Sequence, residues 1–339
     1  MNYQVWSQAL KGIMRLDRDD WNKLDYFAKW LVSTRAAVLV MTFISAAIAG
    51  ILAWRDGGFV WWRWLLLALG LVLAHAANNI INDITDYKKG VDQDNYFRTQ
   101  YGLQPLEMGF VTEKQAYRMA GITGLLAIAA GLPLVISSEL PAWILLGLGI
   151  FFVLFYTWPL KYIGLGEIAV LLVWGPLMIG GGYYVITQNL DWSKLVPVII
   201  ASLPYALGTT MVIFGKHIDK IEADKAKGIH TLPVLIGEKP ARYITLAMML
   251  IQYLLVGYLV ITGFYSPVLL VVLLAVTSLP GVWKVYRNSK PAACPPDFPE
   301  DAWPLYYVAL AFQHNRQFGL WYLAGMLVDT ILRTTGVFH

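Results

Sequence analysis

Charged residues are scarce in this sequence. Only 14% of its 339 residues are Asp, Glu, Lys or Arg, whereas 58% are hydrophobic and the mean hydropathy is +0.55. A soluble domain has roughly 25% charged residues, so about half of the charge needed to coat a water-facing surface is missing. The composition therefore excludes a soluble enzyme.

Cysteine is almost absent as well, with Cys294 as the single copy. One cysteine cannot form an intrachain disulfide, and it cannot supply the thiolate cluster of a zinc or iron–sulfur site. Any metal that binds here must be held by oxygen or histidine ligands.

Long hydrophobic runs, in contrast, are abundant. About 20 apolar residues cross a bilayer as a helix, and windows of about 19 residues predict nine spans in this sequence. The predicted spans are 36–54, 60–82, 118–138, 142–159, 166–187, 195–215, 243–264, 267–285 and 318–334. The sequence therefore predicts an all-α integral membrane protein, a bundle of nine transmembrane helices, in which residues 36–339 form a single polytopic domain.

Two segments outside these spans are also partly apolar. In residues 1–35 the apolar side chains are scattered among charges, which differs from the continuous apolar core of a signal peptide. We expect this segment to be a cytoplasmic amphipathic segment in the membrane interface. The stretch Trp303 to Phe312 is too short to span, and we expect it to be interfacial or re-entrant.

Basic residues concentrate on one side of the predicted membrane. Outside Arg55, Arg63, Lys194 and Arg333, they precede the first span or follow the even-numbered spans. Lys and Arg favour cytoplasmic loops, so we expect the N-terminus and these loops to be cytoplasmic, in a protein of the cell (inner) membrane. This bias also accounts for the net charge of +4 without a nucleic-acid partner.

Two acidic clusters break the apolar pattern. The first runs from Asn78 to Asp94 at the end of the second span, and the second runs from His217 to Asp224 at the end of the sixth. Because four spans separate them, the chain returns to the same side, and both clusters should meet the cytoplasmic face. The repetition is consistent with an internal structural duplication.

At about 100° per residue, the polar residues of the second span form one stripe. Its members are His75, Asn78, Asn79, Asn82 and Asp86. Unsatisfied amides and carboxylates facing lipid cost several kcal/mol, so the stripe should line an interior cavity that opens to the cytoplasm. For His75 and Asn78, hydrogen bonds that join helices are the alternative. For Asn82, Asp86 and Asp92 we favour a functional role.

In the second cluster, uninterrupted helical spacing places Thr210, His217, Lys220 and Asp224 on one side and turns Asp219 away. Crowded carboxylates repel one another unless a cation neutralises them, and hard oxygen ligands select magnesium or calcium. Mg²⁺ typically takes one or two carboxylates plus phosphate oxygens, so two facing clusters suit a magnesium-bridged diphosphate. For either cluster alone, a solvated acidic loop is the alternative.

These residues resemble the UbiA superfamily of membrane prenyltransferases, from Arg35 to Val328. The resemblance rests on Asn82-Asp83-x-x-Asp86 with Gly90 and Asp92, on Asp219-x-x-Glu222-x-Asp224 with Gly228 and Thr231, and on Gly164-Leu-Gly166-Glu167, Gly175-Pro176 and Gly182-Tyr183-Tyr184. Within the superfamily, the pattern is most similar to the dihydroxynaphthoate prenyltransferases of menaquinone synthesis.

The resemblance implies nine helices around a central cavity with cytoplasmic cap loops, and two aspartate-rich motifs that hold Mg²⁺ and the diphosphate of a polyprenyl donor for transfer to an aromatic acceptor. With the polar stripes, it makes Asp86, Asp92 and Asp224 the catalytic candidates. The candidate metal ligands are Asn82, Asp86, Asp92, Asp219 and Asp224. The candidate substrate-binding residues are Arg35, Asn78, Tyr156, Lys161, His217 and Lys220.

The chain departs from the family pattern at one position. Four residues before Asp224 the family usually has aspartate, whereas this chain has Lys220, with Asp219 as the nearest acid. Two geometries are open: the helix end is rewound so that Asp219 reaches inward, or Lys220 binds the diphosphate directly. An aspartate that deprotonates the acceptor would be Asp86 or Asp92.

Other acceptors and two other classes of function are the alternatives to this assignment. The acceptor is alternatively hydroxybenzoate, homogentisate, or a chlorin or lipid alcohol. A secondary transporter is disfavoured because transporters place ionisable residues near the bilayer midplane, and a non-catalytic assembly factor is favoured only by Lys220.

We expect residues 102–109, in the long connection after the second span, to form a cap that excludes water. Nothing in the sequence specifies an oligomeric state.

Overall fold

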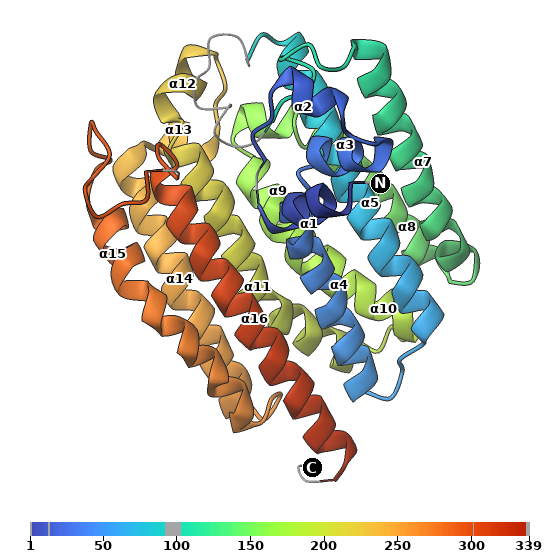
Figure 1. The fold of residues 1–339 in the computed structure, drawn as a ribbon. Helices are drawn as coiled ribbons and strands as arrows, with labels where there is room; N and C mark the ends of the chain where they lie inside the picture. Colours follow the sequence, from blue (N-terminus) through green and yellow to red (C-terminus); the bar gives the residue numbers. More distant parts are fainter. Residues whose placement is uncertain (1, 13, 92–102, 301, 337–339) are drawn as a thin grey trace.

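The computed structural model describes residues 2–12, 14–91, 103–300 and 302–336, and all regular structure in these ranges is helical (Figure 1). The elements of the first half are α1 (Tyr3–Lys11), α2 (Arg18–Asn22), α3 (Tyr26–Ser33), α4 (Ala36–Arg55), α5 (Trp61–Lys88), α7 (Glu113–Ile136), α8 (Leu140–Phe155), η1 (Leu160–Ile163), α9 (Gly166–Leu172), η2 (Val173–Gly181) and α10 (Gly182–Thr187). Those of the second half are α11 (Trp192–Ile218), α12 (Ile221–Ala226), α13 (Leu232–Ile236), α14 (Glu238–Ile261), η3 (Pro267–Ser278), α15 (Leu279–Arg287) and α16 (Tyr306–Thr334).

Seven helical segments of the described chain are long and apolar enough to cross a membrane: α4, α5, α7, the continuous run Gly166–Thr187, α11, α14 and the run Pro267–Arg287. The remaining two predicted spans coincide with α8, which has 16 residues, and with α16, which has 29. The prediction of an all-helical membrane protein is confirmed, and the count of nine spans stays a prediction.

The expectation of a separate re-entrant segment at Trp303 to Phe312 is wrong, and its position at the membrane interface stays a prediction. The segment from Tyr306 onward belongs to the same helix as the last predicted span, which is therefore much longer than the hydropathy window indicated. The polar run from His314 to Gln317 depresses the local hydropathy, but His314 and Asn315 are buried inside the bundle. A window average does not distinguish a polar residue facing the protein interior from one facing water.

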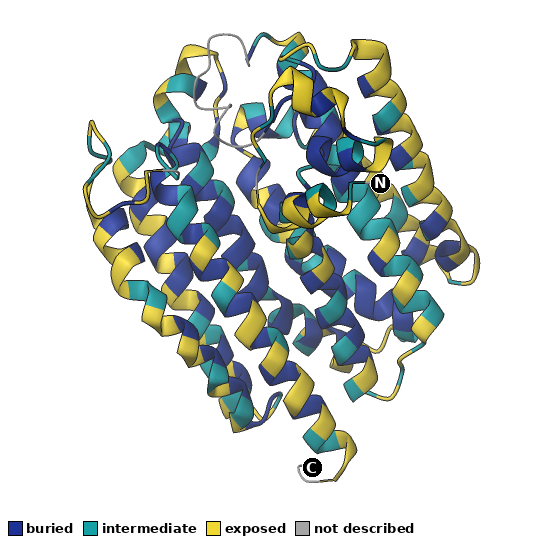
Figure 2. Ribbon diagram, viewed as in Figure 1, coloured by how far each residue is buried: buried dark blue, intermediate teal, exposed yellow. Residues whose placement is uncertain are grey.

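Large apolar side chains cover the outside of the bundle. Figure 2 shows exposed residues along the outer faces of α7 and α15, and they include Leu125, Leu126 and Trp283. An exposed apolar belt of this size indicates contact with lipid.

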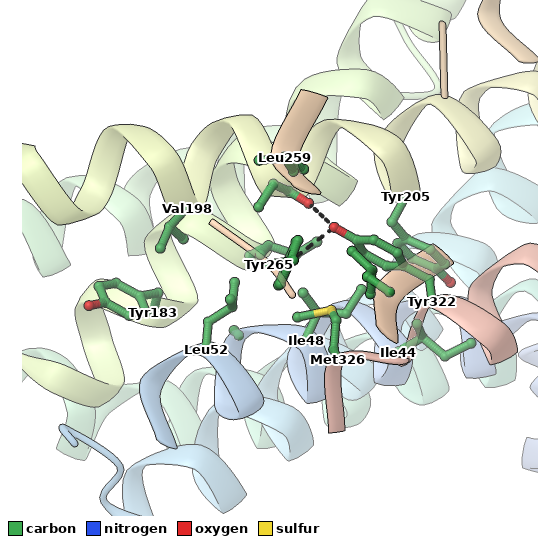
Figure 3. Close-up of a cluster of buried hydrophobic side chains, with 14 of the residues drawn as sticks. Ile44, Ile48, Leu52, Tyr183, Val198, Tyr205, Leu259, Tyr265, Tyr322 and Met326 are labelled. Carbon is green, nitrogen blue, oxygen red and sulfur yellow. Dashed lines mark hydrogen bonds between the residues drawn. The ribbon is translucent and has the colours of Figure 1, made fainter. Parts of the chain in front are cut away.

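Polar groups inside the bundle bond to one another. The Tyr322 hydroxyl donates to the Ala201 carbonyl at 2.8 Å and lies 3.3 Å from the Tyr265 hydroxyl (Figure 3).

The three N-terminal helices pack against the protein. Trp21, Ala28 and Leu31 form one buried cluster with Ala76 of α5 and with Leu103. The Arg18 guanidinium donates to the Gly109 carbonyl at 2.9 Å, so the N-terminal helices and the segment 103–111 hold each other in place. The described part of the expected cap is therefore a turn packed against α2.

Helices α11 and α16 approach each other closely near the second acidic cluster. A Cβ on Gly215 of α11 would lie 2.9 Å from the Cα and 3.0 Å from the amide nitrogen of Val308 in α16. Backbone atoms cannot move aside as the end of a flexible side chain can, so this contact requires glycine.

We therefore expect Gly215→Ala to lower the free energy of unfolding by about 1–3 kcal/mol, because the added methyl group forces α16 away from α11. Gly257→Ala in α14 is the matched control, since its Cβ would meet nothing within 4 Å. Thermal unfolding in detergent compares the two variants. Equal melting temperatures would show that the contact tolerates a side chain.

Candidate functional site

The two acidic clusters lie at the same end of the bundle. The Lys227 ammonium, just after α12, donates to the carbonyl of Gly90, just after α5, at 2.9 Å. Helices α12 and α13 lie at the end of the molecule opposite to the C-terminus (Figure 1). The prediction that the two clusters meet at one end of the bundle is confirmed by this contact, and the number of spans between them stays a prediction.

Asp86 is the centre of the first cluster. Its carboxylate is fully buried, and the ammonium of Lys161 donates to its two oxygens at 2.9 and 3.0 Å. Lys161 belongs to η1, and its side chain is also buried. The candidate substrate-binding lysine therefore lies directly on the candidate metal ligand.

Asp83 has a partner of its own. Its carboxylate forms a salt bridge with Arg35, the residue between α3 and α4. Arg35 has a φ of 52°, a left-handed conformation that is uncommon outside glycine. The sequence predicts a substrate contact for Arg35 and no role for Asp83, whereas in the structure the two side chains form an ion pair that fixes the start of α4 against the end of α5.

The amides of the stripe on α5 contact neighbouring helices. Asn78 donates to the Val153 carbonyl of α8 at 2.9 Å, and Asn79 donates to the Thr34 carbonyl at 2.8 Å. For Asn78 this is the helix-joining role that was the alternative. The Asn82 oxygen accepts from the Thr157 hydroxyl at 3.3 Å, next to Tyr156 at the end of α8. Asn82 therefore faces the short connection that carries Lys161.

The second cluster is built around Asp224. The helix does not continue through it, because α11 ends at Ile218 and α12 begins at Ile221. The assumption of uninterrupted helical spacing is wrong, yet Lys220 still faces Asp224, with 2.9 Å between the ammonium and Oδ1. Both side chains are buried, and neither Asp224 oxygen accepts a well-aligned hydrogen bond from the described residues. Asp224 thus has acceptor capacity left over for a ligand.

Asp219 points away from Lys220 and Asp224. Its carboxylate accepts hydrogen bonds from the amides of Tyr306, Tyr307 and Val308 at 3.0–3.1 Å, and Lys290 lies 3.4 Å away. Burial raises the pKa of Asp219 to about 6, against the lowering effects of Lys290 and of these amides. Asp219 therefore caps the start of α16, and we leave it out of the proposed metal set.

A third element connects the two clusters. Glu167 at the start of α9 is fully buried, and its Oε1 lies 2.6 Å from Nδ1 of His217 on α11. Its Oε2 accepts from the amide of Leu232, where α13 begins. Residues 160–167, here called the bridging segment, therefore contact Asp86 through Lys161 and the second cluster through Glu167.

A metal would need ligands from more than one source. No group of three His, Cys, Asp or Glu side chains close enough to hold a metal occurs in the described part of the chain. Mg²⁺ commonly binds through one or two carboxylates and takes its other ligands from substrate phosphates and water. The buried oxygens of Asp224 that lack a hydrogen bond fit such an ion. Asp92 lies outside the described residues, so its metal role stays a prediction.

Residues 43–303 match the model of the UbiA prenyltransferase family. The chain belongs to this family and is a prenyltransferase. It is 31% identical over 222 residues to 1,4-dihydroxy-2-naphthoate octaprenyltransferase of Escherichia coli (strain K12). The aligned region covers 63% of this chain and 70% of that enzyme.

Solved structures share the fold. The apo structure of a UbiA homolog from Aeropyrum pernix K1 has a TM-score of 0.65 at 20% identity and covers 86% of this chain and 98% of its own. The structure of a UbiA homolog from Archaeoglobus fulgidus bound to GPP and Mg²⁺ has a TM-score of 0.55 at 15% identity, covering 88% of this chain and 99% of its own.

The ion-pair partners of Asp86 and Asp224 in this UbiA prenyltransferase were not predicted from the sequence. Lys161 and Lys220 were proposed to bind substrate, but their pairing with Asp86 and Asp224 was not foreseen. Glu167 belongs to the Gly164-Leu-Gly166-Glu167 motif, but no role was predicted for it, although an acid at the start of an apolar span signals a buried polar contact.

A hollow lined by Ile80, Asp83 and Ala116 lies between α5 and α7. The central cavity stays a prediction.

The cap role of Asp219 predicts a specific outcome for Asp219→Ala. The free energy of unfolding should fall by about 3–5 kcal/mol, because Lys290 and the first amides of α16 lose their buried acceptor. The Michaelis constant for the donor should not change in the folded fraction. Thermal unfolding and donor titration measure both quantities, with the exposed Glu222→Ala as control. Unchanged stability together with lost metal dependence would make Asp219 a metal ligand.

Proposed function

We propose that this prenyltransferase transfers a polyprenyl group from a polyprenyl diphosphate to dihydroxynaphthoate in menaquinone synthesis, with Mg²⁺ as its cofactor. The observation that carries the proposal is the pair of buried Asp–Lys contacts, Asp86 with Lys161 and Asp224 with Lys220, tied together by the bridging segment. The similarity to the naphthoate enzyme of Escherichia coli supports the acceptor, and the Archaeoglobus fulgidus homolog bound to GPP and Mg²⁺ supports the donor and the ion.

Reaction begins with departure of the diphosphate from the allylic carbon of the donor. Breaking this carbon–oxygen bond leaves negative charge on the diphosphate, which preorganised positive groups stabilise. Mg²⁺, when bound, would neutralise part of that charge as a Lewis acid. Asp86, Asp92 and Asp224 would hold it, with the amide oxygen of Asn82 nearby.

The lysines of the site act on the same charge. Lys161 and Lys220 present buried ammonium groups, where water screens their field poorly. Each would donate charge-assisted hydrogen bonds to the diphosphate oxygens. The electron-rich ring carbon of the acceptor then forms the new carbon–carbon bond, and Asp86 or Asp92 is the candidate base that deprotonates the acceptor.

Water must stay away from the prenyl cation, since water would convert it to an alcohol. The segment 103–111 packs against α2 and against the end of α5 that carries Asp83 and Asp86. We propose that this packed layer of N-terminal helices and cap shields the reacting carbon, and that it lies on the cytoplasmic side of the inner membrane.

The acceptor is tested with a labelled polyprenyl diphosphate and purified enzyme in detergent. Dihydroxynaphthoate should be prenylated at least about tenfold faster than hydroxybenzoate or homogentisate, because a buried polar site discriminates strongly among hydroxylated rings. Chelation of Mg²⁺ should abolish transfer. Asp224→Asn should also abolish it, whereas Glu222→Gln, an exposed neighbour on α12, should not. Faster transfer to another ring would replace the proposed acceptor.

The orientation predicts which membrane side reaches each loop. In a Cys294→Ser background, Glu222→Cys should react with a membrane-impermeant thiol reagent only from the cytoplasmic side, and Lys194→Cys, just inside the start of α11, only from the opposite side. Both native side chains are exposed, so accessibility does not limit labelling. Intact cells and inside-out vesicles provide the comparison. Labelling of both from one side would refute the topology.

A further inference from the structure

We propose that Lys161 and Lys220 occupy the carboxylates of the donor site until the diphosphate arrives, so that the divalent cation and the donor bind together. This inference rests on the proposed function and adds an order of assembly to it. Each lysine would have two positions: on its aspartate when the site is empty, and on the diphosphate when the site is loaded.

The contact of Lys161 with Asp86 shows how completely a lysine can fill a ligand position. The ammonium lies within 3.0 Å of both carboxylate oxygens, and the two side chains are 8% and 0% exposed. A lysine ammonium donates up to three hydrogen bonds, and here two of them point at the lone pairs that a cation would use. Metal and lysine therefore compete for the same oxygens.

Lys220 forms an ion pair with Asp224 within a single turn. It lies four residues before Asp224, and the pair is 2.9 Å apart with side-chain exposures of 4% and 2%. Because the carboxylate oxygens of Asp224 accept no aligned hydrogen bond from the described residues, this lysine neutralises the aspartate without saturating it. Asp224 is thus held in a buried, charge-balanced state that a better ligand can displace.

Charge balance decides when that displacement happens. A cation that takes Asp224 must leave the Lys220 ammonium buried and without its counter-ion, which is costly in a site of low dielectric. A diphosphate supplies the missing negative charge and accepts hydrogen bonds from the displaced ammonium. The donor should therefore raise the affinity for the cation, and by linkage the cation should raise the affinity for the donor to the same degree.

The test measures binding of Mn²⁺ alone to the purified full-length protein, by electron paramagnetic resonance of the free ion. Wild type should bind Mn²⁺ weakly without donor. Lys220→Met and Lys161→Met should each bind it about ten- to a hundredfold more tightly, because a competing charge-assisted contact is gone. Lys220→Arg retains the charge and should behave like wild type, as should Lys225→Met, which removes an exposed lysine next to Asp224.

A second titration, with geranyl diphosphate present, separates this mechanism from a simple change in net charge. Wild type should then gain Mn²⁺ affinity, and both methionine variants should show a smaller gain and weaker donor binding. Unchanged or weaker Mn²⁺ binding by the methionine variants without donor would overturn the proposal. If a variant unfolds without metal, Mn²⁺ should raise its melting temperature more than that of wild type, and an equal rise would overturn the proposal too.

Failure of the proposed function looks different. Absence of Mn²⁺ binding by wild type even with geranyl diphosphate would contradict metal-dependent transfer itself. Unchanged Mn²⁺ affinity in the lysine variants, beside normal prenyl transfer by wild type, would leave that function standing and reject only the lysine mechanism.

Discussion

Burial of carboxylates at the end of a membrane-embedded bundle is the constraint on which this site depends. Burying an isolated carboxylate costs several kcal/mol of folding free energy, so each one needs a cation or several hydrogen-bond donors. Asp86 has Lys161, Asp224 has Lys220, and Asp83 has Arg35. The η1 turn and the start of α4 are thereby fixed against α5, whereas Lys220 and Asp224 pair within the first turn of α12.

The Asp219 cap shows how this constraint extends into the second half of the bundle. Three backbone amides at the start of α16 converge on one carboxylate, and the Gly215 contact brings the same turn of α16 against α11. Asp219 and Lys220, adjacent in the second acidic cluster, therefore have different structural roles. Asp219 holds the bundle together, and Lys220 faces the site.

Much of the architecture could be predicted from the sequence because hydropathy and charge act locally. Runs such as 36–54 and 60–82 predict helices directly, and these coincide with α4 and with most of α5. The start of α16 was missed because His314 and Asn315 are buried polar residues that a hydropathy average treats as surface. The partner of Asp86 was missed because pairing with Lys161, 75 residues away, depends on packing that no local pattern encodes. Lys220 lies only four residues before Asp224, so its place on the same side as Asp224 could be predicted from helical spacing, although the ion pair itself was not.

We propose that both acidic clusters serve one donor site. A crystal structure of the protein with Mn²⁺ and geranyl thiolodiphosphate, an analogue whose diphosphate leaves slowly, tests it most directly through the anomalous signal of the metal. We expect Mn²⁺ and the diphosphate to lie between Asp86 and Asp224, with the Lys161 and Lys220 ammonium groups moved onto the phosphate oxygens. Metal and diphosphate bound at one cluster alone, with the other Asp–Lys pair undisturbed, would contradict it.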